Sequence, residues 1–116
     1  MRFGQFEFGS LQIDGVTYQH DIVIDRGKVR KRKKKLSKPF RGSYGHTPLT
    51  VAEDVPWKCR KLVVGTGANG GLPILDEVVQ EAKVRQVVLV VAPTAKAIQE
   101  LINSDDSTNA ILHVTC

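Results

Sequence analysis

Hydrophobic and polar positions alternate in the first third of the chain, as they do in half-buried β-strands. Segments 11–13 and 16–24 both show this two-residue period, and Asp14 and Gly15 between them favour a tight hairpin turn. A second turn at 25–28 precedes another alternating segment, which starts at Val29. The pattern predicts an antiparallel β-meander.

The second half of the chain has a different pattern. Segment 62–65 is a short apolar run, and the apolar residues of segment 74–83 recur at helical spacing. Segment 86–92 is almost wholly valine and leucine, which is typical of a central strand covered on both faces. Thr94 is a candidate N-cap for a second helix, and segment 110–115 predicts a last strand. This order of strands and helices predicts parallel strands joined by crossover helices.

Together the two patterns predict an α/β fold. It has a central mixed, mostly parallel sheet of about five strands, flanking helices, and an added N-terminal antiparallel meander. A chain of 116 residues fits one domain and buries about 65% of its unfolded surface. Between the two halves, segment 37–48 has the composition of a loop, and the capping-box pattern from Thr50 to Glu53 predicts a short helix before Pro56.

The positive charge of the chain is local. Ten of the 17 basic residues lie between Arg26 and Arg41, with no acidic residue among them. One interpretation is contact with a nucleic-acid backbone through Arg30, Arg32 and Lys34. The preferred interpretation is a solvated edge strand protected by its charges, because segment 29–36 has no interleaved aromatic residues and strand side chains alternate between faces. Nucleic acid is therefore the less favoured partner.

Four glycines in seven positions follow the apolar run at 62–65 and match the pattern G-x-G-x-x-G. A dinucleotide site would also need an acidic residue at the end of the next strand, and segment 87–93 has none. Two interpretations remain, a purely structural turn and a small anion site at the N-terminus of the following helix. The candidate anion-binding residues are Gly65, Thr66, Gly67, Asn69 and Gly70.

The three histidines have no spacing that predicts a metal site, and no metal or cofactor is expected. His20, next to Asp21, and His46 are candidates for a base and the group that orients it. His113 and Cys116 are three apart on the last predicted strand, so their side chains are expected on opposite faces.

Composition narrows the location. No apolar run is long enough to cross a bilayer, and the first residues lack the apolar core of a secretory signal. Two cysteines do not make a disulfide framework. We therefore expect a soluble protein of the cytoplasm.

The chain resembles the small Mth-type domain family, most closely its short archaeal and bacterial members. Relatives in that family include an adipogenesis-associated protein and a mitochondrial complex I assembly factor. The resemblance extends over essentially the whole chain. It is carried by Phe8–Gly9, Ile13–Gly15, Tyr18–Ile24, Leu36–Lys38, His46–Leu49, Leu62–Gly67, Pro93–Thr94, Ala97 and Ile111–Cys116.

The resemblance implies that this α/β fold is arranged in three layers, but it supplies no activity, catalytic residue or cofactor. The leading hypothesis is a non-enzymatic interaction or assembly protein, monomeric or homodimeric, with a small anion cleft at Gly65–Gly71. One alternative is a small-molecule enzyme that uses the same cleft. The other is nucleic-acid binding through residues 26–41.

Overall fold

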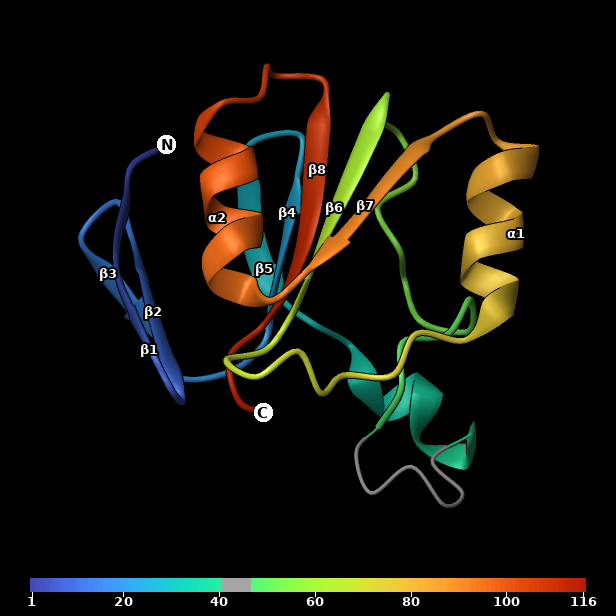
Figure 1. Ribbon diagram of the computed structural model, residues 1–116, viewed down its shortest axis with the longest axis horizontal. Helices are drawn as coiled ribbons and strands as arrows, with labels where there is room; N and C mark the ends of the chain where they lie inside the picture. The colour runs from blue at the N-terminus through green and yellow to red at the C-terminus, as the bar shows by residue number, and fades with distance from the viewer. Residues whose placement is uncertain (41–46) are drawn as a thin grey trace.

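The strands form two sheets, shown in Figure 1 for a computed structural model that describes residues 1–40 and 47–116. The candidate base His46 lies outside these described residues. The elements are β1 (Phe3–Glu7), β2 (Ser10–Ile13), β3 (Val16–Tyr18), β4 (Ile22–Asp25), β5 (Lys28–Lys31), the 3₁₀ helix η1 (Lys34–Phe40), β6 (Lys61–Thr66), α1 (Asp76–Val84), β7 (Val88–Ala92), α2 (Thr94–Ile102) and β8 (Thr108–His113).

The larger sheet has the strand order β5-β4-β8-β6-β7. β6 is parallel to both β7 and β8, whereas β4 runs antiparallel to β5 and β8. The predicted strands at 62–65 and 87–91 are therefore parallel neighbours, with α1 between them in sequence. The mixed α/β fold is confirmed.

Both faces of this sheet are buried, because alternate residues of its strands join two different core clusters. Val63 and Leu112 pack with Leu11 and Ile98 on the face covered by α2 and the small sheet. Their strand neighbours, such as Val64, join the second cluster, which includes residues of α1 and of segment 49–72. β8 supplies buried side chains to both clusters and is buried along its whole length.

The predicted meander is divided between the two sheets. The small sheet has the order β1-β2-β3, with a hairpin at Asp14 and Gly15, where φ is 50° and 81°. The expected single strand at 16–24 is wrong, because it breaks after Tyr18 and resumes at Ile22 beside β8. The break leaves the carboxylate of Asp21 able to accept hydrogen bonds at the end of the larger sheet.

The region around the basic run also differs from the predictions. The strand predicted to start at Val29 is β5, which ends at Lys31, and η1 covers part of the segment predicted as loop. The helix expected from the capping-box pattern is a turn, in which the Ala52 N–H donates to Thr50 Oγ1 at 3.1 Å. The fourth residue of the pattern, Glu53, bonds an arginine side chain and not the helix terminus that the pattern predicts.

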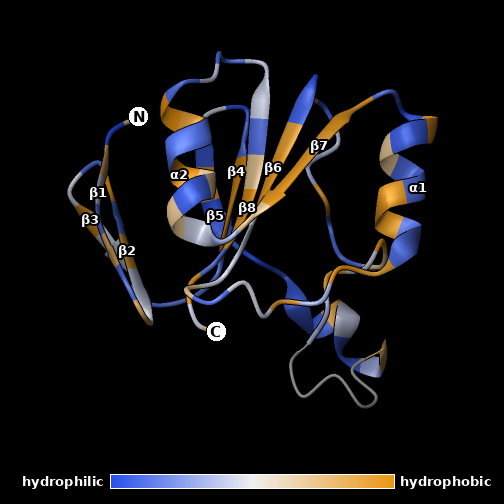
Figure 2. Cartoon of the chain, in the orientation of Figure 1, coloured by the Kyte–Doolittle hydropathy of each residue, from blue (hydrophilic) through white to orange (hydrophobic). Residues whose placement is uncertain are grey.

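β7 lies at the edge of the larger sheet, not at its centre as its composition predicts. Figure 2 shows it in the hydrophobic colour along its length. Val88 and Val91 are 61% and 49% exposed. A continuous apolar run shows that a strand is hydrophobic, but it does not show that a second neighbouring strand is present.

Candidate functional site

The carboxyl ends of the three parallel strands meet at one edge of the larger sheet. β6 ends at Thr66, β7 at Ala92 and β8 at His113, and the glycine turn and the chain terminus follow directly. Figure 1 shows the C-terminal residues beside the chain that leaves β6. In open α/β sheets this edge is where ligands bind, so it is the first candidate for a functional site.

The glycine turn is packed against the C-terminal residues of the chain. The N–H of Ala68 donates to the Thr115 carbonyl oxygen, and the N–H of Gly71 donates to the Cys116 carbonyl oxygen, both at 2.9 Å. The N–H of Gly67 donates to Thr94 Oγ1 at 2.8 Å. Backbone donors that were candidates for holding an anion therefore already have protein acceptors.

Two glycines of the turn are required by close approach. Gly67 has φ +104°, and a Cβ there would overlap the carbonyl oxygen of Thr115. A Cβ on Gly65 would lie 2.8 Å from Thr94 Oγ1. Thr66 is buried and Asn69 is exposed. These placements favour the structural interpretation of the motif.

The predicted helix does not begin directly after the glycines. α1 starts at Asp76, beyond segment 72–75, and its first turn carries Asp76 and Glu77. The helix terminus at the glycine turn is that of α2, where the Thr94 N–H donates to the Gly67 carbonyl oxygen at 3.0 Å. Thr94 Oγ1 also donates to the His113 carbonyl oxygen at 2.6 Å.

Asp21 pairs with His113 rather than with the candidate His20. His113 Nδ1 lies 2.8 Å from Asp21 Oδ2, and the Val114 N–H donates to Asp21 Oδ1 at 3.0 Å. His20 Nδ1 contacts only the Asp21 carbonyl oxygen, at 3.0 Å. On the other side of its ring, His113 Nε2 lies 3.1 Å from Thr115 Oγ1.

Arg32 links this pair to a second buried carboxylate. Its Nη1 donates to Asp21 Oδ2 at 3.0 Å, while Nε and Nη2 bond the two carboxylate oxygens of Glu53 at 2.8 and 2.9 Å. Nη2 also donates to the Pro48 carbonyl oxygen at 3.0 Å. The side chains of Arg32, Asp21 and Glu53 are 1%, 5% and 3% exposed. We call Glu53, Arg32, Asp21 and His113 the buried network.

The network fixes the charge of Asp21. Burial opposes ionisation, but the hydrogen bond and charge of His113, the Val114 N–H and the charge of Arg32 outweigh it and lower the Asp21 pKa from 3.8 to about 2. At Glu53, Ser37 Oγ donates to Oε2 and lies 2.8 Å from Thr50 Oγ1. The polar groups of this region therefore satisfy one another.

The three candidates for nucleic-acid contact do not share one surface. Arg30 is half-buried, donates to the Asp54 carbonyl oxygen at 2.7 Å and pairs with its carboxylate. Lys34 is exposed in η1, beyond the strand. The burial of Arg32 corrects the expectation that the run is solvated throughout. Arginine suits that position because its planar, permanently charged group can bond two carboxylates at once.

A small cavity of about 170 Å³ lies next to the buried network. We call it the His20 pocket. Arg32 shares its single positive charge between the buried carboxylates of Asp21 and Glu53, and the other cationic side chains of the lining are those of the two exposed lysines, Lys31 and Lys34. Its lining residues are Gln19, His20, Asp21, Lys31, Arg32, Lys34, Val114 and Thr115.

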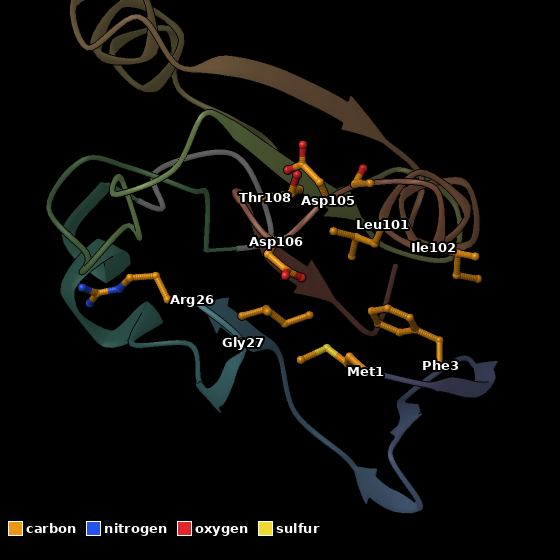
Figure 3. Close-up of a pocket in the computed structure, with 11 residues that line it drawn as sticks. Met1, Phe3, Arg26, Gly27, Leu101, Ile102, Asp105, Asp106 and Thr108 are labelled. Atoms are coloured by element: carbon orange, nitrogen blue, oxygen red, sulfur yellow. The ribbon is translucent and has the colours of Figure 1, made fainter.

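A larger cavity of about 480 Å³ lies at the opposite end of β8. Figure 3 shows Met1, Phe3, Leu101 and Ile102 around it, with acidic side chains at its rim. Its described lining has no histidine, cysteine or lysine, and its Asp105 is hydrogen-bonded by Ser107. We place the candidate chemistry at the His20 pocket despite its smaller size, because that pocket adjoins the buried network.

The described residues contain neither a candidate metal site nor a helix that could span a membrane. Residues 1–40 and 47–116 contain no cluster of three or more histidine, cysteine or acidic side chains able to hold a metal ion. In the same ranges, no helix is both long and apolar enough to traverse a bilayer.

Sequence reasoning missed the buried network, which is the basis of the candidate site. Asp21 and His113 are 92 residues apart, and Arg32 lies within a run of lysines. One signal was available, because arginine recurs at Arg30 and Arg32 within a run otherwise dominated by lysine. No periodicity in the neighbouring sequence indicates which carboxylates Arg32 contacts.

Comparison with known proteins shows where the chain belongs. No protein-family model matches it, and no curated protein does. Among solved structures, MT938 is similar over 98% of this chain and 97% of its own, with a TM-score of 0.68 and 24% identity. An outer membrane protein from Bartonella henselae, at 11% identity and a TM-score of 0.66, covers 98% of this chain and 94% of its own and shares the fold.

The conserved hypothetical protein PH1505 from Pyrococcus horikoshii is more similar. It is 32% identical, the match covers 100% of both chains, and the TM-score is 0.79. The chain therefore belongs to the family of PH1505, a family of hypothetical proteins.

Proposed function

We propose that this protein binds a small anionic molecule in the His20 pocket. The observation that carries the proposal is the charge of the lining, which combines two exposed lysines, Lys31 and Lys34, with one carboxylate, Asp21, that is already paired with Arg32. This moves the expected anion site from the backbone of Gly65–Gly71 to side chains, because the N–H groups of Gly67, Ala68, Gly70 and Gly71 already bond protein acceptors.

The volume of the pocket limits the ligand. Drug-sized ligands occupy clefts of about 300–1,000 Å³, and the His20 pocket holds about 170 Å³. It therefore suits a phosphate, or a carboxylate carried on a few carbon atoms, rather than a nucleotide. Two lysines supply charge without fixed geometry, whereas arginine would select a planar group.

The test is the thermal midpoint in phosphate, sulfate and succinate, compared at equal ionic strength. At ten times the dissociation constant, one site stabilises the fold by about 1.4 kcal/mol, which raises the midpoint by about 5 °C. The double variant Lys31→Gln/Lys34→Gln should lose this shift. Its control, Lys83→Gln/Lys96→Gln, removes two exposed lysines elsewhere and should keep it.

An equal shift in both double variants would refute the proposal. So would a wild-type midpoint that does not move at tens of millimolar of any of the three anions.

We propose assembly through β7 as a second function, consistent with an interaction or assembly protein. Hydrophobic edge strands pair readily with other strands, and Val88 and Val91 are exposed on this one. The proposed partner is β7 of a second copy. Light scattering at increasing concentration should show a dimer that Val88→Lys abolishes and Val16→Lys, on β3, preserves. A wild type that stays monomeric at millimolar concentration would refute it.

The remaining parts of the proposal come from the sequence. They are a single domain over residues 1–116, membership of the Mth-type family, the three-layer arrangement, and a cytoplasmic location. The resemblance and the fold shared with MT938 support the family assignment. Roles in adipogenesis or complex I assembly are not carried over, because fold does not determine function. Nucleic-acid binding is less favoured, since Arg32 is buried.

A further inference from the structure

We propose that Thr115 is a nucleophile, that His113 is its general base, and that the protein hydrolyses small acyl esters bearing a negative charge. The inference rests on the proposed function, because the charged part of the substrate would occupy the His20 pocket. Asp21 acts as a positioning residue through His113. The three side chains form a continuous hydrogen-bonded series, with distances of 2.8 Å and 3.1 Å.

The hydrogen-bond partners decide where the proton of the neutral imidazole lies. Asp21 is ionised and can only accept, so His113 Nδ1 must carry the proton and donate it. Nε2 of the neutral ring is then an acceptor, and the Thr115 hydroxyl donates to it. This is the arrangement of a nucleophile, a base and the group that orients the base.

Burial distinguishes the base from the nucleophile. His113 and Asp21 are each 6% exposed, which keeps bulk water from competing for their hydrogen bonds. Thr115 is half-buried and lines the His20 pocket. The base is therefore buried, and the residue that carries the nucleophile lies at the wall of a cavity.

The rest of the network holds Asp21 in place. Arg32 Nη1 and the Val114 N–H each occupy one carboxylate oxygen, so Asp21 cannot rotate away from His113 without breaking both bonds. Glu53 in turn holds Arg32 through two hydrogen bonds. The buried network therefore orients the base.

The reaction proceeds in two steps, acylation of Thr115 and hydrolysis of the acyl group. Thr115 Oγ1 attacks the carbonyl carbon of the ester while its proton passes to His113 Nε2. The bond between carbon and the leaving oxygen breaks, and the leaving alcohol takes that proton. Water then attacks the acyl–Thr115 ester, again through His113, and releases the acid and the free hydroxyl. Only ester and water are consumed.

The charge of the pocket defines the substrate class. Lys31 and Lys34 attract a carboxylate on the acyl group, and they are the cationic side chains available to stabilise the oxyanion that forms at the carbonyl. The volume of about 170 Å³ restricts the acyl part to a few carbon atoms. The mono-p-nitrophenyl ester of succinic acid is the matching probe, and p-nitrophenyl acetate is its uncharged counterpart.

The experiment follows p-nitrophenol release and locates the acyl group by peptide mapping. The wild type should show a burst, with an acyl group on Thr115 that hydroxylamine removes; amides formed on lysines resist hydroxylamine. Thr115→Val is nearly isosteric and should lose burst and adduct. Thr17→Val, an exposed threonine on β3, should keep both.

Asp21→Asn tests the positioning role. The rate should fall by about 10²–10⁴-fold, and the dependence of the rate on pH should be altered. A variant that loses rate with an unchanged pH profile would contradict the positioning role. Circular dichroism and the thermal midpoint verify that each variant is folded.

The two probes separate this inference from the proposed function. A preference in acylation rate for the succinate ester over the acetate ester, abolished in Lys31→Gln/Lys34→Gln, supports both. Acylation of Thr115 without preference for the charged ester overturns the anion site alone. Anion binding without any hydroxylamine-sensitive adduct at Thr115, or with equal turnover by Thr115→Val, overturns the nucleophile.

Discussion

The glycine turn at 65–71 and the basic run that begins at Arg26 differ in where their polar groups find partners. The turn has the pattern of a ligand site, yet the N–H groups of Ala68 and Gly71 bond the carbonyl oxygens of Thr115 and Cys116. The run has the pattern of a solvated surface, yet Arg32 lies in the buried network. A sequence motif indicates the local conformation or charge, but the rest of the fold determines which groups the motif bonds.

The largest expected effect is at Arg32. Arg32→Met should destabilise the fold by about 3–5 kcal/mol, because it leaves the Asp21 and Glu53 carboxylates buried without a countercharge. Lys35→Met, exposed in the same run, should stay within about 0.5 kcal/mol. Urea denaturation measures both. Equal losses of unfolding free energy in the two variants would contradict the difference in burial between Arg32 and Lys35.

The turn provides the next test. Gly67→Ala should cost about 2–3 kcal/mol, since it combines a positive φ with a Cβ that overlaps the Thr115 carbonyl oxygen. Gly70 also has positive φ, but the nearest atom to its Cβ would be 3.5 Å away. Gly70→Ala should therefore cost about 1 kcal/mol. If the two midpoints of denaturation coincide, the packing of the turn on the C-terminal residues contributes nothing.

Acid should weaken the buried network. The Asp21 pKa is about 2 in the fold and 3.8 ordinarily, so its stabilisation is complete above about pH 4 and is lost as the pH falls through about 2. The loss amounts to about 2 kcal/mol. Free energies of unfolding measured from pH 5 to 2 should fall less steeply in Asp21→Asn. Asp76→Asn, exposed on α1, should retain the wild-type slope.

The smallest effect is expected on the outer surface of the run. Lys33→Glu/Lys34→Glu should change the unfolding free energy by less than about 1 kcal/mol, because both lysines are exposed and surface ion pairs contribute little. Titration with duplex and single-stranded oligonucleotides at two salt concentrations should detect no tight binding by the wild type. Binding that weakens steeply with salt and disappears in the charge-swapped variant would restore the nucleic-acid hypothesis.

Local patterns predicted the elements that depend on neighbouring residues. Asp14 and Gly15 located a hairpin because both adopt positive φ. The periodicity around α1 and the two flanking apolar runs predicted the parallel β6–β7 pair. In each case the determining interactions lie within a few residues, or within one strand–helix–strand unit.

What the sequence could not predict depends on distant partners. The chain breaks at 19–21 because β3 pairs with β2 whereas β4 pairs with β8, and alternation within the segment is the same either way. β7 was expected at the centre because valine-rich strands are usually covered on both sides. The partners of Arg32 and His113 were unpredictable for the same reason, since register across the sheet sets them.

The position of β8 has a consequence for folding kinetics. It follows every other strand in the sequence, yet it lies between β4 and β6 in the sheet. Before it docks, the β4–β5 hairpin and the β6–β7 pair each present an open edge, and closing the sheet requires contacts of high sequence separation, which slow folding. Asp21 and His113 meet only when this gap is filled. Substitutions there should therefore accelerate unfolding far more than they slow folding.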